Sequence, residues 1–301
     1  MTDSGVNVEP GGSDDLDAAA AIFTSVRPRL FGIAYRMLSS ATEAEDLVQD
    51  VWLRWQTTDR SAVLNPAAFL ATTTTRLAIN SLQSARVRRE TYIGPWLPEP
   101  VDTSADPYLG AERGEALEFA ALLLMEKLTP NERAAYVLRE AFDYPYAQIA
   151  DILQSTEPAV RQLVSRARKS VTSEKRTPVS TAAQRELLTT FITAARSGDM
   201  AALEKLFAPD VASVSDGNGA VRVSRRPVVG IERVAKYLSA ITWYWEGVDV
   251  RWASTNGQTS AVLYRDGAVE AVLTVTTSAG GIDKVLWMMN QDKISTLSVP
   301  A

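Results

Sequence analysis

Residues 129–171 contain short helical segments separated by turns, and the last of these segments is strongly basic. One turn is marked by Asp143-Tyr144-Pro145, and a second break at Ser155-Thr156 precedes a helix over 157–171. Between residues 161 and 176 there are six basic side chains against one acid. A charged helix that follows such a turn is typical of the helix-turn-helix, whose second helix enters the major groove. The pattern predicts double-stranded DNA as a partner.

The helix over 157–171 has an apolar stripe and a polar face. Its apolar residues recur at three- and four-residue steps, namely Val160, Leu163, Val164, Ala167 and Val171. Residues near the N-terminus of a recognition helix face base edges, so base contacts are expected from Glu157, Ala159, Arg161 and Gln162. Phosphate contacts are expected from Arg166, Arg168 and Lys169, and Ser165 is a further DNA-binding residue on this polar face. The alternative is an ordinary bundle helix with a solvated charged face, which the two turns and the one-sided charge disfavour.

Composition limits the remaining possibilities. A chain of 301 residues suits two or three domains, and its 46% apolar content is enough for globular cores. Cys and His are both absent, which excludes disulfides, thiolate metal sites and a histidine base. We therefore expect no cofactor and no metal. No apolar run approaches the roughly 20 residues that span a bilayer, so we expect a cytoplasmic protein without membrane contact.

The N-terminal part predicts a second helical module after an acidic tail. Residues 1–20 carry five acids and no base, and we interpret them as a disordered tail. Ser40 and Glu43 form a capping-box pattern before an amphipathic helix. A helix after Asn65-Pro66 ends in Arg86-Val87-Arg88-Arg89. Taken alone, an acidic helix face or a basic cluster of this kind is usually only solvated.

The rest of the chain predicts a connector and an α+β domain. Three prolines between residues 95 and 100 favour an extended segment, which opens an acidic connector over 94–125. Residues 184–297 start with two helices, continue with strand-like runs at 211–215 and 219–224, and end in a β-rich meander. The region 184–297 also contains aromatic and Met side chains that could line a pocket, although we favour the alternative that they fill a core. They are Trp243, Tyr244, Trp245, Trp252, Trp287, Met288 and Met289.

Together these segments resemble the group IV (extracytoplasmic-function, ECF) RNA polymerase sigma factors. The run Ala44 to Trp52 is similar to their polymerase-binding helix, and Asn65 to Asn80 is similar to the promoter-melting segment of region 2. Leu128 to Lys169 is similar to region 4. The resemblance implies two all-α sigma modules, region 2 over 21–93 and region 4 over 126–176.

The same resemblance implies partners and site residues. Core RNA polymerase, at the clamp of its largest subunits, would contact Glu45, Asp46, Gln49, Asp50 and Trp52. The −10 promoter element would contact Arg76, Asn80, Arg86, Arg88 and Arg89, and the helix over 157–169 would bind the −35 element. The two elements lie roughly 60 Å apart along the duplex, which two modules on a connector can span.

The resemblance extends to the SigJ-type subgroup, which carries a fused SnoaL-like domain of the NTF2-like fold. It is carried by the linker Trp96 to Pro100, by the loop Asp216 to Ala220 and by the run Asn290 to Ile294. The loop has Ala220 where the subgroup has lysine, and Gln291 stands in place of a proline. Regulatory contacts are therefore expected from Trp96, Leu97, Pro98, Glu99, Pro100, Asp216, Gly217, Asn218 and Gly219.

Three functions stay open at this point. The favoured one is a sigma factor for transcription initiation, regulated by its C-terminal domain and without enzymatic activity. The second is a ligand-sensing helix-turn-helix regulator, whose C-terminal domain would bind a small molecule. Such a regulator needs no second basic module. The third is a SnoaL-like isomerase or hydrolase with a DNA-binding module, in which Asp216 or Tyr264 would act.

Overall fold

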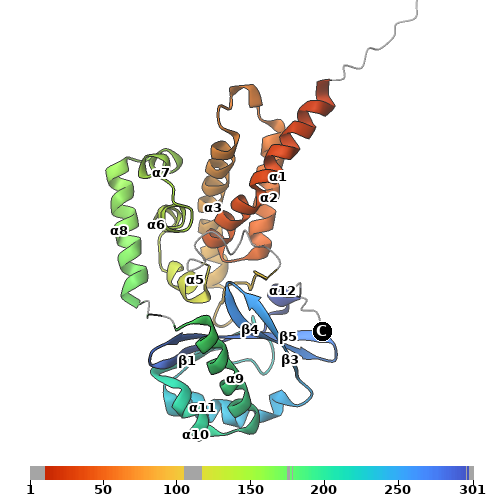
Figure 1. Cartoon of the computed structure of the whole chain (residues 1–301), viewed down its shortest axis with the longest axis vertical. Coiled ribbons are helices and arrows are strands. Elements are labelled where there is room, and N and C mark those ends of the chain that lie inside the picture. Colours follow the sequence, from red (N-terminus) through yellow and green to blue (C-terminus); the bar gives the residue numbers. More distant parts are fainter. Residues whose placement is uncertain (1–10, 105–116, 175–176, 178, 296, 298–301) are drawn as a thin grey trace, which may run out of the picture.

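The computed structural model describes residues 11–104, 117–174, 177, 179–295 and 297. Two groups of helices lie side by side above a domain in which a curved sheet packs against helices (Figure 1). Residues 1–10 of the predicted tail and residues 105–116 of the predicted connector lie outside the described part. None of the described helices is long and apolar enough to cross a membrane.

The N-terminal module contains α1 Gly11–Leu38, α2 Ala41–Thr57, the short 3₁₀ helix η1 Arg60–Ala62 and α3 Pro66–Glu90. Ser40 Oγ accepts a hydrogen bond from the Glu43 amide at 3.1 Å, so the predicted cap begins α2. The prediction of a tail up to residue 20 was wrong for residues 11–20, which are helical. The indole Nε1 of Trp55 donates to the Ala19 carbonyl at 3.1 Å, and this tertiary contact holds the segment on the bundle.

The second module contains α5 Phe119–Met125, α6 Pro130–Tyr136, the π-helical turn η3 Val137–Ala141, α7 Tyr146–Leu153 and α8 Glu157–Glu174. Thr129 and Glu132 form a reciprocal capping box at the start of α6. Gln154 takes the left-handed conformation, with φ 50°, and ends α7 one turn before α8. The structure therefore confirms the helix-turn-helix that the turn residues predicted.

The two helical modules share one hydrophobic core and are joined by buried polar contacts. Arg133 of α6 is 1% exposed, and its Nε donates to the Arg36 carbonyl of α1 at 2.9 Å. Its Nη1 pairs with Glu126 at 2.6 Å. A buried guanidinium is tolerated only when it is paired and hydrogen-bonded, so α6 depends on the bundle beside it.

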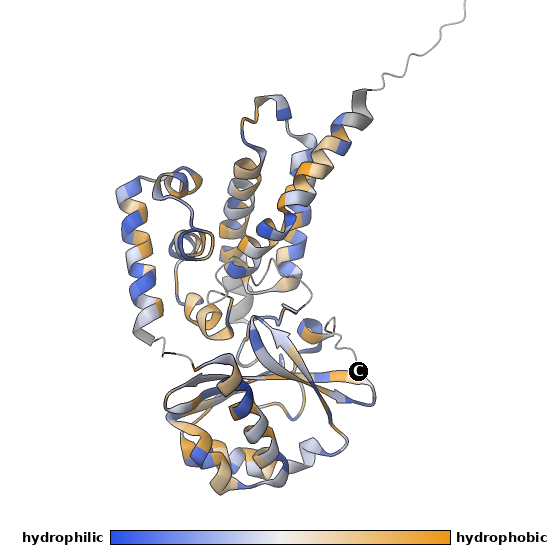
Figure 2. Cartoon of the chain, in the orientation of Figure 1, coloured by the Kyte–Doolittle hydropathy of each residue, from blue (hydrophilic) through white to orange (hydrophobic). Residues whose placement is uncertain are grey.

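The C-terminal domain has a six-stranded sheet in the order β2-β1-β6-β5-β4-β3. β1 runs parallel to β6, and the other neighbours are antiparallel. Figure 1 shows α9, α10 and α11 below the sheet, and Figure 2 shows orange apolar and blue polar residues mixed along these helices. The strands are β1 Phe207–Asp216, β2 Val228–Val229, β3 Asp249–Thr255, β4 Gln258–Arg265, β5 Ala268–Ser278 and β6 Gly281–Met288. The helices are α9 Thr181–Ser197, α10 Met200–Leu206, α11 Ile231–Ala240, the 3₁₀ helix η4 Thr242–Trp245 and α12 Gln291–Ile294.

One expected strand is absent from the described part of this domain. Residues 219–224, predicted as a strand, form turns, and the chain pairs with β1 only later, through β2. Asn218 has a φ of 46° and Arg222 a φ of 68°. These left-handed conformations are incompatible with the extended backbone of a strand, so the segment is a loop between two strands.

Candidate interfaces for DNA, polymerase and the linker

Helix α8 presents the predicted DNA-binding face to solvent. Val160, Val164, Ala167 and Val171 are buried, as the apolar stripe predicted. The outward residues Gln162, Ser165 and Lys169 are exposed, while Glu157 and Ala159 are partly exposed. Figure 1 shows α8 at the outer edge of the molecule, clear of both other modules along its length. The helix is thus available to a duplex in this conformation.

The arginines of α8 are held in place by neighbouring acids. Arg161 Nη2 lies 2.5 Å from Glu157 Oε1, and its guanidinium lies 4.3 Å from the ring centroid of Tyr146. Arg168 pairs with Glu140 at 2.7 Å, and this hydrogen bond raises the pKa of the guanidinium. Arg166 pairs with Glu132 at 3.2 Å. Exposed pairs of this kind contribute little net stability, so DNA phosphates can replace the carboxylates at small cost.

Four of the five predicted polymerase-binding residues line a hollow between α1 and α2, and Asp50 does not. Glu45, Asp46, Gln49 and Asp50 are exposed on one face of α2. The hollow has a volume of about 280 Å³ and is lined by Phe23, Arg27, Glu45, Asp46, Val48, Gln49 and Trp52. Trp52 is only partly exposed, because its ring packs 5.0 Å from that of Phe23. The hollow therefore combines an aromatic floor with an acidic rim.

The candidate −10 residues all belong to α3. Asn80 is exposed, whereas the Arg76 side chain contacts the other helical module. Arg76 Nε donates to the Ile152 carbonyl at 2.9 Å, and its Nη2 donates to the Asp151 carbonyl at 3.0 Å. The side chains of Arg86, Arg88 and Arg89 lie outside the described set. In this arrangement Arg76 is engaged with the end of α7.

Asp216, at the end of β1, is the centre of the contact between the linker and the C-terminal domain. Its side chain is fully buried. Oδ2 accepts from the Leu97 amide at 2.8 Å and from Lys293 Nζ at 2.8 Å, and Oδ1 accepts from the Tyr92 hydroxyl. Lys293 Nζ also donates to the Leu97 carbonyl at 2.6 Å and lies 4.1 Å from the Trp96 ring centroid. The carboxylate is thus occupied by linker donors and a cation, and this leaves it unsuited to act as a catalytic base.

The second half of the linker is anchored to the N-terminal module. Glu99 is buried, and its two carboxylate oxygens accept from Ser40 Oγ at 2.7 Å and from the Thr42 amide at 2.9 Å. The Tyr35 hydroxyl donates to the Glu99 carbonyl at 2.6 Å. Burial, more than the nearby Glu99 charge, raises the pKa of Tyr35, so this hydroxyl keeps its proton. Pro98 and Pro100 are buried beside Glu99 in the extended segment.

The loop after Asp216 lies against the first residues of the linker. A Cβ on Gly219 would lie 3.2 Å from the Ile93 side chain, and Gly219 has a φ of 81°. A Cβ on Gly217 would lie 2.7 Å from Val223, so this position has no room for a side chain. Asn218 is exposed in the turn. Trp96, Leu97 and the loop after Asp216 are therefore brought together, whereas Glu99 contacts the N-terminal module and Asn218 is exposed.

Several residues of this junction were missed as site residues. Asn256, in the turn before β4, donates through Nδ2 to the Tyr35 hydroxyl at 2.6 Å and to the Leu117 carbonyl at 3.1 Å. Tyr92 and Asn256 follow no motif, and tertiary packing alone brings them into the junction. Lys293 lies in the run 290–294, which resembles a motif of the subgroup. Its positive charge could therefore have been predicted from the sequence as a partner for Asp216.

Replacing Asp216 with Asn should loosen the linker, because Lys293 is then buried without its counter-charge. We expect a loss of about 3 kcal/mol of unfolding free energy, as for other broken buried pairs. Asp216→Leu combined with Lys293→Met removes both charges and should recover part of this loss. Urea unfolding of Asp216→Leu, Lys293→Met and their double variant, with Trp fluorescence as the signal, measures the coupling. If the losses of unfolding free energy in the two single variants add up to the loss in the double variant, the two side chains are not coupled.

Comparisons with known proteins agree with this geometry. Residues 22–88 match the model of Sigma-70 region 2, and residues 118–171 match that of Sigma-70, region 4. The chain is 35% identical over 288 residues to the ECF RNA polymerase sigma factor SigJ of Mycobacterium tuberculosis strain H37Rv, an alignment that covers 91% of this chain and 92% of the relative. It is 29% identical over 273 residues to a probable ECF RNA polymerase sigma factor, SigI, from strain CDC 1551 of the same species, covering 89% and 92%.

The fold is shared with a solved structure along nearly the whole chain. The crystal structure of the Mycobacterium tuberculosis extracytoplasmic function sigma factor SigJ superposes with a TM-score of 0.75 at 31% identity, covering 93% of this chain and all of that one. The α+β domain therefore follows the two helical modules in both proteins. With both sigma regions present in order and a full-length relative at 35% identity, the chain belongs to the ECF RNA polymerase sigma factors, which initiate transcription and are not enzymes.

Proposed function

We propose that this sigma factor docks core RNA polymerase on the acidic hollow between α1 and α2 and binds the −35 element through α8. The observation that carries the proposal is the exposed face of α8, where three arginines form surface ion pairs and Arg161 also lies on the Tyr146 ring. The partner at the hollow is the clamp of the largest polymerase subunits, and the site of action is the cytoplasm. Transcription in vitro with core polymerase and a pool of promoter templates tests this function.

The two competing functions fit the geometry less well. A ligand-sensing helix-turn-helix regulator binds duplex DNA alone and needs no acidic hollow on a second module. It would fail to support initiation in the same transcription assay. An isomerase or hydrolase using Asp216 requires a free carboxylate, whereas this one accepts hydrogen bonds from Tyr92, Leu97 and Lys293.

We further propose that the C-terminal domain regulates initiation by holding the two helical modules together. Promoter elements roughly 60 Å apart require the modules to separate on DNA. In the described conformation they share a core, and Arg76 of the −10 group is engaged by α7. The linker is fixed to the C-terminal domain at Asp216 and to region 2 at Glu99. Polymerase and promoter must therefore supply the energy that opens the molecule.

Reversing the acidic face should weaken polymerase binding. We expect Asp46→Lys combined with Asp50→Lys to lower affinity for core polymerase at least about tenfold, because interface charges of equal sign repel. Glu186→Lys with Glu246→Lys makes the same change in net charge on exposed positions of the C-terminal domain and should leave affinity unchanged. Fluorescence anisotropy of the labelled chain with core polymerase measures both. Equal affinities for the two variants would move the docking site elsewhere.

The base-reading role of Arg161 predicts a change in sequence preference. Arg161→Gln should reduce discrimination at one position of the −35 element by about 1–3 kcal/mol, as for a lost bidentate contact to a base. Arg166→Gln, on the same helix, should weaken binding to all sequences equally if it holds a phosphate. Competition among −35 variants in the presence of core polymerase separates the two. A uniform loss for Arg161→Gln would assign it to the backbone.

Separation of the modules can be measured directly because the chain has no cysteine. Gln83→Cys on α3 and Ser155→Cys before α8 place spin labels on exposed positions of the two modules. We expect their distance to lengthen by tens of ångströms when core polymerase and promoter are added, toward the roughly 60 Å spacing of the elements. Labels at Thr190→Cys and Lys236→Cys, both in the C-terminal domain, should keep their distance. A constant distance for the first pair would rule out opening.

A further inference from the structure

The loop between β1 and β2 carries a positive charge that no described acid neutralises. From residue 217 to residue 236 the sequence has five basic side chains and one acid, Glu232, although the whole chain has a net charge of −5. Arg222, Arg225 and Arg226 lie in this loop, and all three are exposed. In the part of the chain that the structure describes, no acid pairs with them, whereas each of the three arginines of α8 has a carboxylate beside it. Like charges this close in sequence repel one another, so the loop favours an anionic partner.

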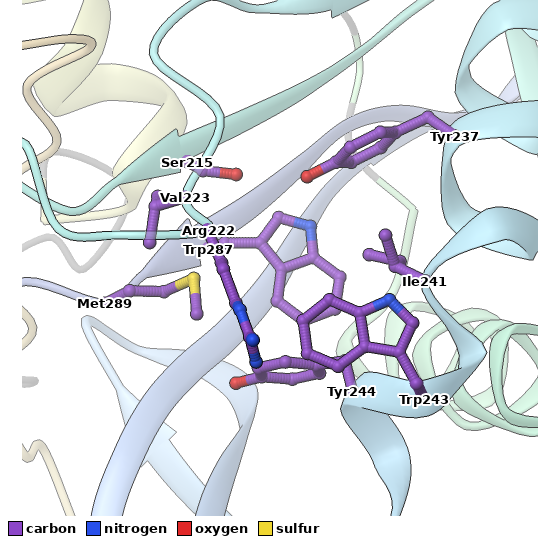
Figure 3. Close-up of a pocket in the computed structure, with 9 residues that line it drawn as sticks. All are labelled: Ser215, Arg222, Val223, Tyr237, Ile241, Trp243, Tyr244, Trp287 and Met289. Carbon is purple, nitrogen blue, oxygen red and sulfur yellow. The ribbon is translucent and has the colours of Figure 1, made fainter.

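Arg222 lies over an aromatic side chain at the surface of the domain. Its guanidinium lies 5.4 Å from the ring centroid of Trp243, which is 45% exposed. Figure 3 shows the Arg222 side chain extending toward the rings of Trp243 and Tyr244. The rings of Tyr244 and Trp287 pack on each other, and the cavity beside them measures about 30 Å³, which is room for water but not for a ligand. The charge of the loop therefore points to a partner outside the domain.

The basic loop lies against the first residues after α3. A Cβ on Gly94 would lie 3.5 Å from the Cα of Arg225, and a Cβ on Gly219 would lie 3.2 Å from the Ile93 side chain. The last turns of α3 carry the arginines at positions 86, 88 and 89, which are predicted to bind the −10 element. Position 89 is five residues from Gly94, which is at most about 18 Å of chain at about 3.6 Å per residue. The loop is therefore a neighbour of the basic end of α3.

The contacts of the linker hold this loop beside α3. The linker is fixed to the C-terminal domain because Asp216 accepts a hydrogen bond from the Leu97 amide. It is also fixed to region 2, because Glu99 accepts from Ser40 and from the Thr42 amide. Since α3 belongs to region 2, the C-terminal domain and α3 form one unit. Separation of region 4 from this unit leaves the loop in place beside α3.

We propose that residues 221–226 bind the sugar-phosphate backbone of promoter DNA next to the −10 element, so that the C-terminal domain extends the DNA contact of α3. Arginine suits phosphate because its guanidinium combines a permanent charge with paired N–H donors. Trp243, beside Arg222, offers a ring on which an unpaired base can stack where the duplex opens. The place of α3 at the −10 element belongs to the proposed function, on which this contact therefore rests.

Directed cleavage of DNA tests the position of the loop. The chain has no cysteine, so Val221→Cys, at a position that is 88% exposed, attaches an iron–EDTA group at a single place. The labelled chain is assembled with core polymerase and promoter in the absence of nucleotides, so that no RNA is present. Ascorbate and peroxide should then cut the DNA next to the −10 element. Thr190→Cys, on an exposed position of α9, carries the same group and should give no cuts there.

The pattern of cuts separates the outcomes. Cuts on both strands place duplex DNA at the loop, and cuts on one strand place a separated strand there; either result supports the contact. A complex that supports transcription but is not cut near the −10 element from position 221 overturns it, as does cleavage of a polymerase subunit in place of DNA. An unmodified chain that forms no promoter complex contradicts the sigma function itself, and the loop contact with it.

Charge variants test the contact with phosphate. Binding of the holoenzyme to promoter DNA is measured at several salt concentrations. Arg225→Gln combined with Arg226→Gln should reduce the slope of log K against log salt by about 0.9 for each lost phosphate contact, and so by about 1.8 in total. Arg185→Gln combined with Lys205→Gln makes the same change in charge on exposed positions of α9 and α10 and should leave the slope unchanged. Thermal unfolding checks the fold of each variant. Equal slopes for the two folded double variants overturn the contact.

Discussion

The buried Asp216 carboxylate is the contact on which the arrangement of the domains depends. Moving a charge out of water costs several kcal/mol unless it is paired and fully hydrogen-bonded. Here the compensation comes from Lys293 within the same domain, from Tyr92 just before the linker and from the Leu97 amide in the linker. When the linker leaves, the carboxylate keeps Lys293 but loses its two other hydrogen-bond donors. This mutual dependence gives the linker one defined path, which a purely apolar contact would not specify.

The fixed linker, in turn, limits how the two helical modules can move. Glu99 occupies the N-terminal end of α2 by accepting from the Thr42 amide and from Ser40, so the linker and region 2 form one unit with the C-terminal domain. Region 4 follows the linker and packs on region 2 through the buried Arg133. The closed state is stabilised by a shared core and by the buried Arg133, and under the proposed regulation the partners must offset these contacts to open the molecule.

Local elements were predictable from the sequence, and long-range contacts were not. Helices α6 and α8 follow from caps and apolar spacing that lie within a few residues of each other. The contact of Arg76 with α7 joins residues 75 positions apart, and no spacing pattern reports it. Residues 219–224 have the composition of a strand, but the left-handed φ of Arg222 excludes it, and composition does not reveal φ. Asp216 and Leu97 were singled out through a family resemblance, while their hydrogen bond required the fold.

In the loop after Asp216, this chain has Ala220 where the subgroup it resembles has a lysine. The position of Lys293 explains why the buried Asp216 needs no lysine at position 220. Ala220 is exposed in the turn, so a lysine there would face solvent rather than the buried carboxylate. Lys293 reaches Asp216 from α12, and its ammonium is held by the Leu97 carbonyl and the Trp96 ring. The charge that neutralises Asp216 therefore comes from the second motif, at the C-terminal end of the domain. In this chain the junction is complete without a lysine in the loop, because Lys293 supplies the positive charge.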